Sequence, residues 1–220
     1  MAEQLIINSQ NNNIGRGGNY SGIQARGTRD GSIFTCDWLE ALGQEGRVFF
    51  GSDADQNDAL TGQTSFANTT PTLLLNVPAS AVAIPLYLKL VEVGTVAGAL
   101  IDVINEIDNI AAYASGGTEE TVLSSRTDAP IAKLCSLYST PTATAGYGVN
   151  IDADRLAPDV DPASADAGGP FKYEWNRGAR PIYLVGPASW KIFTFAGTTG
   201  PSWTWTICWA ELPASALTST

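Results

Sequence analysis

The sequence predicts an all-β protein, a jelly-roll β-sandwich of about eight antiparallel strands with an extended N-terminal arm. Three observations predict this class. Only 15% of the 220 residues are charged and 22 are glycine, a composition that favours short strands and turns over long helices. The last apolar segment has a strict two-residue period. Apolar segments recur between turn residues without an internal repeat, which argues against a propeller or a solenoid.

The stretch from Trp190 to Leu212 organises the chain. In its second half the apolar residues recur at every second position, so they share one face of a strand over 202–212. The break at 196–201 has the residues of a loop, and we therefore expect the two halves to pair as a hairpin. A row of aromatic side chains of this size can anchor a core. The core residues that we expect are Trp190, Ile192, Trp203, Trp205, Ile207 and Trp209.

An alternative use of this row is a platform for sugar rings or bases, which stack on aromatic side chains at alternate strand positions. A nucleic-acid platform needs a basic surround, whereas this chain has 12 Lys plus Arg against 22 Asp plus Glu and a net charge of −10. We therefore expect no nucleic-acid partner. A glycan bound at Trp190, Trp203 or Trp205 stays open as the alternative function.

Residues 1–30 form the predicted arm, and residues 31–220 form the sandwich domain. The arm is rich in Asn, Gln and Gly, with one short apolar group at 5–7, so it cannot build a core alone. It is either a flexible tail or a segment that becomes ordered on a neighbouring subunit. Its positive charges, Arg16, Arg26 and Arg29, are the candidate interface residues for an acidic surface.

The elements of the sandwich follow in order. Residues 32–42 suit a short helix capped by Thr35 and ended by Gly43, or alternatively a strand. Segments 71–76 and 83–93 are predicted strands joined by a turn. A strand is favoured over a helix at 99–107, because strand signals flank it. We further expect strands at 47–51, 171–175 and 181–185, partly buried segments at 121–125 and 130–138, a turn-like 140–150 and an acidic surface loop at 151–170.

Composition excludes several chemistries. The chain has no histidine, which excludes hydrolase triads that use histidine and metal sites built on it. Cys36, Cys135 and Cys208 are scattered without metal-ligand spacing and do not indicate a disulfide framework. No apolar run reaches the roughly 18 residues of a membrane span, and the start lacks the pattern of a signal peptide. We expect a soluble protein made in a cytoplasm, with no membrane partner.

The acidic loops are the remaining candidates for a site. The loop that begins at Asp53 resembles a calcium loop, but Asp58 and Thr64 stand where such a loop needs Gly and Glu, so a solvated turn is favoured. The aspartates between 152 and 166 have the residue type of a glycosidase, yet proximity in sequence does not place two carboxylates across a cleft. We therefore expect no enzyme activity, no cofactor and no resident metal.

Several short segments follow one another in a distinctive order along the chain. They are Arg29–Ser32, Gly46–Gly51, Thr72–Pro78, Ile84–Tyr87, Arg126–Pro130, Lys172–Trp175 and Trp203–Leu212. Their succession resembles virion structural proteins of tailed bacteriophages. The resemblance implies a jelly-roll cement or decoration protein on the outer surface of the capsid. It implies a homotrimer that binds the major capsid protein, and it supplies no catalytic residues. The other function that stays open is a carbohydrate-binding or host-attachment module that uses surface tryptophans.

Overall fold

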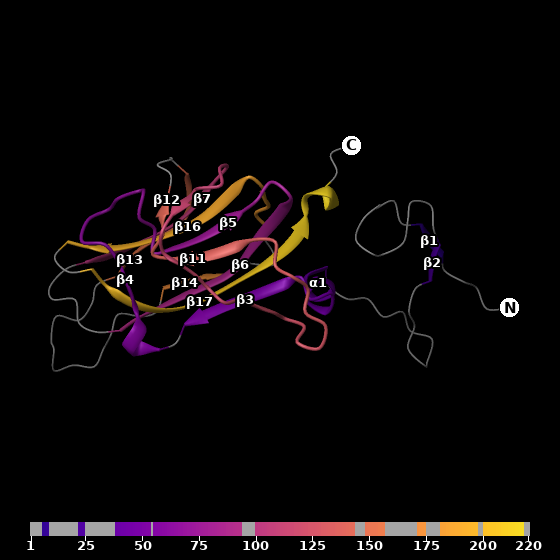
Figure 1. Ribbon diagram of the computed structural model, residues 1–220, viewed down its shortest axis with the longest axis horizontal. Helices are drawn as coiled ribbons and strands as arrows, with labels where there is room; N and C mark the ends of the chain where they lie inside the picture. The colour runs from indigo at the N-terminus through magenta and orange to yellow at the C-terminus, as the bar shows by residue number, and fades with distance from the viewer. Residues whose placement is uncertain are drawn as a thin grey trace.

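The computed structural model describes residues 6–8, 22–24, 38–53, 55–93, 100–143, 148–156, 171–174, 181–197 and 200–217. Eight principal strands build two stacked sheets (Figure 1). In chain order they are β3 (Val48–Asp53), β5 (Leu73–Val77), β6 (Ala81–Glu92), β7 (Ile101–Asp108), β13 (Val149–Leu156), β14 (Phe171–Glu174), β16 (Ala188–Ala196) and β17 (Ser202–Pro213).

The order of these strands is that of a jelly roll. One sheet runs β3-β17-β6-β14 and the other runs β13-β7-β16-β5. If the eight strands are numbered along the chain, the first sheet has the order 1-8-3-6 and the second sheet has the order 5-4-7-2. All their pairings are antiparallel. This double Greek-key wiring confirms the predicted all-β sandwich.

A long excursion between β7 and β13 extends both sheets on one side. Its strand β10 (Leu123–Ser124) pairs with β3, and its strand β11 (Ser136–Ser139) pairs with β5 and with β9 (Thr118–Glu119). The excursion also forms a separate ladder of β8 (Tyr113–Ser115) with β12 (Thr142–Ala143). The side of β3 and β5 is thereby covered, a common protection for sheet edges. On the opposite side β13 and β14 are the outermost strands of the described sheets.

Short elements complete the fold. The helix α1 (Trp38–Gln44) leads into β3 (Figure 1). The remaining strands are β4 (Leu60–Thr61), which pairs with the start of β17, and β15 (Leu184–Val185), which pairs with β6. Two 3-10 turns, η1 (Gln56–Asp58) and η2 (Ala214–Ala216), follow β3 and β17. Strands β1 (Ile6–Asn8) and β2 (Gly22–Gln24) pair with each other in a separate two-stranded sheet.

The core lies between the two sheets and contains the tryptophan row. All six expected core residues belong to one buried cluster with side chains from both sheets, and none is more than 2% exposed. Cys208 points to the other face of β17 and packs in a second cluster with residues of α1 and η2. Alternation along β17 therefore separates the interior face from a face that the short helices cover.

The expected hairpin between the two halves of 190–212 is wrong. Strand β16 pairs with β5 and β7, whereas β17 pairs with β3, β4 and β6. The two strands belong to different sheets, and their tryptophans belong to one buried cluster between the sheets. Both edges of each strand are already paired, so no edge is left for a hairpin.

Two further expectations need correction. Residues 151–156, expected in an acidic loop, belong to β13, which pairs with β7 through a register shift near Asp152. Helix α1 begins at Trp38 and continues past Gly43, so the strand alternative for this segment is wrong. The proposed cap Thr35 lies outside the described residues, as do Arg16, Arg26 and Arg29. The strand favoured at 99–107 is confirmed as β7.

Candidate functional site

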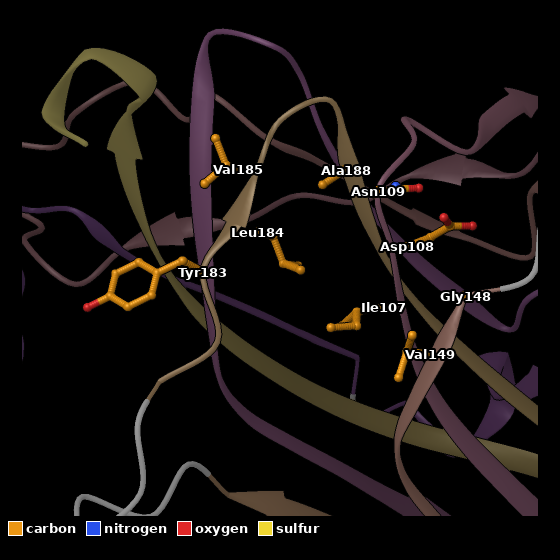
Figure 2. A pocket seen from close by; sticks show the side chains of 9 residues that line it. All are labelled: Ile107, Asp108, Asn109, Gly148, Val149, Tyr183, Leu184, Val185 and Ala188. Carbon is orange, nitrogen blue, oxygen red and sulfur yellow. The ribbon is translucent and has the colours of Figure 1, made fainter. Parts of the chain in front are cut away.

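A hollow opens at the end of the sandwich where β7 finishes and β13 begins. Its volume is about 410 Å³, and its walls are largely apolar. Figure 2 shows Asp108 and Asn109 on one side of the hollow and Tyr183 and Val185 on the other. Val149 is 67% exposed at its rim. The residues lining the hollow are Ile107, Asp108, Asn109, Gly148, Val149, Tyr183, Leu184, Val185 and Ala188.

A buried ionic cluster lies beside this hollow and shares Asp108 with it. The Lys191 ammonium lies 2.5 Å from a carboxylate oxygen of Glu106 and 3.1 Å from one of Asp108. The side chain of Lys191 is fully buried, while those of Glu106 and Asp108 are 8% and 6% exposed. The cluster holds one positive and two negative groups, and burying three ions is costly unless each is closely compensated.

The register of the sheet places these groups together. On β16, Lys191 stands between two core residues, so alternation sends its side chain to the outer face. Glu106 of β7 is its direct partner across the ladder, and Leu74 of β5 is its partner on the other side. Asp108 is two residues further along β7 and reaches Lys191 diagonally. The carboxylates therefore bind Lys191 from one side and an apolar neighbour borders it on the other.

Gly148 and Phe193 complete the surroundings of the cluster. A Cβ atom on Gly148 would lie 2.5 Å from both Cγ and Oε1 of Glu106. Backbone at this position is thus pressed against the carboxylate, and a side chain there has no room. The Lys191 ammonium also lies 5.9 Å from the centroid of the Phe193 ring, a distance at which cation–π attraction contributes.

A second buried carboxylate, Glu211, holds the long excursion onto β17. It is 1% exposed and accepts hydrogen bonds from the backbone N–H of Leu134 at 2.6 Å and of Cys135 at 3.1 Å. The indole N–H of Trp209 donates to it at 2.7 Å. Three donors compensate the charge of the Glu211 carboxylate. The role of Glu211 is therefore structural, because it holds residues 134 and 135 against β17.

The two buried cysteines, Cys135 and Cys208, have unreactive thiols. Burial raises the pKa of the Cys135 thiol, and the neighbouring Glu211 carboxylate adds to the shift. Burial alone raises the pKa of Cys208 to about 12. Since the thiolate is the reactive form, neither thiol is suited to nucleophilic chemistry. Both are free in the structure, and Cys36 lies outside the described residues.

Glu92 is a buried carboxylate without a hydrogen-bond partner for its Oε1 among the described residues. It ends β6 opposite Trp203, is 7% exposed, and burial raises its pKa above the ordinary value of 4.5. The folded state therefore favours the protonated form of the Glu92 carboxyl. The stability that this group contributes is fully present below pH 4.5 and is lost as the pH rises through the raised pKa.

We expect Glu92→Gln to raise the melting temperature at pH 7, because the substitution removes a charge that is poorly solvated. The gain should shrink as pH falls and disappear below 4.5, where the wild-type carboxyl is protonated in both states. Thermal melts of both proteins between acid and neutral pH measure this difference. A gain of the same size at every pH would contradict a charge-based origin.

The other predicted site residues have structural roles. Trp190, Trp203 and Trp205 are at most 2% exposed, so a sugar platform on these three side chains is wrong. In the candidate calcium loop, Asp55 accepts hydrogen bonds from the backbone and side chain of Asn57, as expected for a solvated turn. Across the part of the chain that is described, no three His, Cys, Asp or Glu side chains converge as a metal site.

Sequence reasoning missed both the hollow and the ionic cluster. The signal that could have revealed the ionic cluster is a lysine within an otherwise apolar strand. Such a strand is buried on both faces, so the charge of Lys191 needs a partner of opposite charge. Glu106 and Asp108 share one face of a strand, but only the register of β7 against β16 brings them to Lys191.

A second exposed apolar patch lies on the opposite edge of the sandwich. Phe50 of β3 and Leu123 of β10 are direct neighbours in the ladder and are 46% and 66% exposed. We call this pair the β3 patch, and we call Val149, Tyr183 and Val185 the β13 patch. The two patches lie on opposite sides of the sheet order, and neither resembles the other in composition.

No family model, curated protein or solved structure matches this chain. Among the residues that the structure describes, no helix has both the length and the apolar character needed to span a membrane.

Proposed function

We propose that the protein is a structural subunit of a tailed-bacteriophage virion, a cement or decoration protein that binds the outer surface of the assembled capsid as a homotrimer. It binds the major capsid protein and no nucleic acid. Its work is mechanical, because a subunit that binds the closed shell and not free coat protein lowers the free energy of the closed state.

The observation that carries this proposal is a jelly roll with two different apolar patches on opposite edges. A two-fold dimer needs a patch that fits itself, whereas a ring needs two different patches that fit each other. The β3 patch of one copy and the β13 patch of the next supply such a pair. Jelly rolls are also a recurrent architecture of capsid proteins.

Charge and the preceding segment also support this proposal. The net charge of −10 disfavours attachment to packaged DNA. Residues 4–29 contain Arg16, Arg26 and Arg29 but no acidic residue. Such a segment suits an acidic surface on a neighbouring subunit, and many repeated contacts of this kind add up across a shell.

Binding to shells is tested with empty capsids of the major capsid protein encoded in the same genome, in compact and expanded form. We expect the full chain to sediment with expanded shells and a chain lacking residues 1–30 to stay in the supernatant. A protein that sediments with neither form would leave the proposal without support.

We expect Leu123→Asp and Val185→Asp each to turn a trimer into a monomer, because a charge in either patch blocks one half of the contact. An equimolar mixture of the two variants should form dimers, since each retains the patch that the other lacks. Light scattering during gel filtration measures the masses. Leu100→Asp is the matched control, because Leu100 is 51% exposed and lies in neither patch; it should remain trimeric.

The mixture separates a ring from a two-fold dimer. If one patch pairs with itself, only one of the two variants is monomeric and mixing produces no new species. A wild-type monomer, or a mixture that stays monomeric, would contradict the ring.

A further inference from the structure

We propose that Lys191 and Asp108 are joined by an intramolecular isopeptide bond, formed by the protein itself with Glu106 as the proton carrier. The geometry that points to it is the approach of the Lys191 ammonium to the Asp108 carboxylate at 3.1 Å and to Glu106 at 2.5 Å, in a site where Lys191 has no exposure to solvent. The inference does not depend on a place in a virion.

The arrangement meets the geometric needs of an amide-forming reaction. Reacting groups held about 3–3.5 Å apart in a fixed orientation gain a large part of their rate from proximity. The strand register fixes Lys191 against Glu106, and Asp108 follows on the same face of β7. Both strands are central or paired on both sides, so the side chains are held by rigid elements.

The bond-forming step is balanced without any other reactant. The Nζ atom of Lys191 bonds to Cγ of Asp108, and one C–O bond of the Asp108 carboxylate breaks. The ammonium gives up two protons, and both leave on the departing oxygen as one water molecule. Glu106 accepts a proton from Nζ and passes it to that oxygen, which is general acid–base catalysis, so Glu106 ends the step in the state in which it began.

The surroundings favour the product over the ion pair. Condensation replaces a buried ammonium and a buried carboxylate by a neutral amide, and burial of neutral groups costs less than burial of ions. The remaining Glu106 carboxylate can accept a hydrogen bond from the new amide N–H. Asp108 borders the hollow shown in Figure 2, which gives the released water a way out, whereas backbone at Gly148 closes over Glu106.

The choice of Asp108 as the acyl group follows from this asymmetry. Glu106 lies closer to Lys191, but it is the carboxylate enclosed by Gly148, so a water molecule formed there has no described exit. Asp108 is among the residues that line the hollow, whereas Glu106 is not. The two carboxylate side chains are buried to a similar degree, at 8% and 6% exposed, so the assignment follows from the hollow beside Asp108 and the backbone of Gly148 against Glu106.

Mass spectrometry of the purified full-length protein tests the proposal directly. We expect an intact mass one water lower than the sequence requires. After tryptic digestion, the peptide 90–126 should be joined to the peptide 178–220, with no cleavage after Lys191. Fragmentation should place the link on Asp108. An intact mass equal to that of the sequence would overturn the proposal and leave a buried salt bridge.

Three variants assign the roles. Lys191→Arg keeps the charge but lacks the amine, and Asp108→Ala lacks the acyl group, so both should show their full sequence masses. Glu106→Gln should also show its full mass, because the proton carrier is gone. Circular dichroism checks that each variant is folded. A folded Glu106→Gln protein that still loses a water would overturn the role of Glu106, and a link found on Glu106 would overturn the choice of Asp108.

Discussion

Replacing Glu211 with alanine is expected to lower the free energy of unfolding by about 4 kcal/mol, since each buried donor left without an acceptor costs about 1–3 kcal/mol. Three donors lose their acceptor at once: the backbone N–H groups of Leu134 and Cys135 and the indole N–H of Trp209. Glu211 is 1% exposed, and the bonds from Cys135 and Trp209 are buried, whereas the bond from Leu134 is partly buried. Denaturation in urea, followed by tryptophan fluorescence, measures the loss.

Two further variants make this prediction specific. Glu211→Gln keeps one acceptor oxygen but turns an amide N–H₂ toward the donors, so its loss should lie between the wild type and the alanine variant. Glu119→Ala is the control, because the Glu119 carboxylate also accepts side-chain hydrogen bonds, from Lys133 and Ser136, but is largely exposed. Its effect should be small. Equal losses for Glu211→Ala and Glu119→Ala would contradict the buried anchor.

The expected outcome at Glu211 depends on a part of the fold that the sequence does not reveal. Its position in the period of β17 predicts an inward side chain, and an inward glutamate near the end of a strand needs donors. Two of its three donors come from residues 134 and 135, more than 70 positions earlier along the chain. Nothing local in either segment indicates that the excursion folds back there.

Local pattern was sufficient where one face of a strand is buried. The two-residue period of β17 and the flanked apolar run of β7 each predict the element and its inward residues, because alternation follows directly from strand geometry. Composition predicted the sandwich for a related reason, since many short segments between turns leave few other architectures. The tryptophans of β16 and β17 are buried between the sheets, because their large apolar rings gain most from leaving water.

Pairing between strands could not be predicted in the same way. A loop between two apolar runs suggests a hairpin, yet β16 and β17 lie in opposite sheets. A jelly roll places consecutive strands in different sheets at several points, and the choice depends on which edges are already occupied. The ionic cluster follows from the same long-range register, so no spacing in the sequence shows that Lys191 meets Glu106 and Asp108.

Replacing Trp205 with alanine is expected to lower the free energy of unfolding by about 3–5 kcal/mol, the usual cost of removing a large aromatic side chain from a core. Trp205 is 2% exposed and stands in the middle of β17, opposite Asp53 of β3 and Leu90 of β6. A Cβ atom on Gly51 would lie 3.2 Å from its ring and 2.9 Å from Leu137 Cδ2, so the ring packs with neighbouring side chains against the bare backbone of Gly51.

Phenylalanine substitutions separate ring packing from hydrogen bonding along the same row. The indole N–H of Trp205 has no acceptor among the described residues, so Trp205→Phe loses only part of a ring. Trp209→Phe loses part of a ring and also the hydrogen bond to Glu211 at 2.7 Å, a bond to a charged group worth about 1.5–3 kcal/mol. We therefore expect the urea midpoint to be highest for Trp205→Phe, lower for Trp209→Phe and lowest for Trp205→Ala. A midpoint for Trp205→Ala close to that of the wild type would show that the row does not hold the two sheets together.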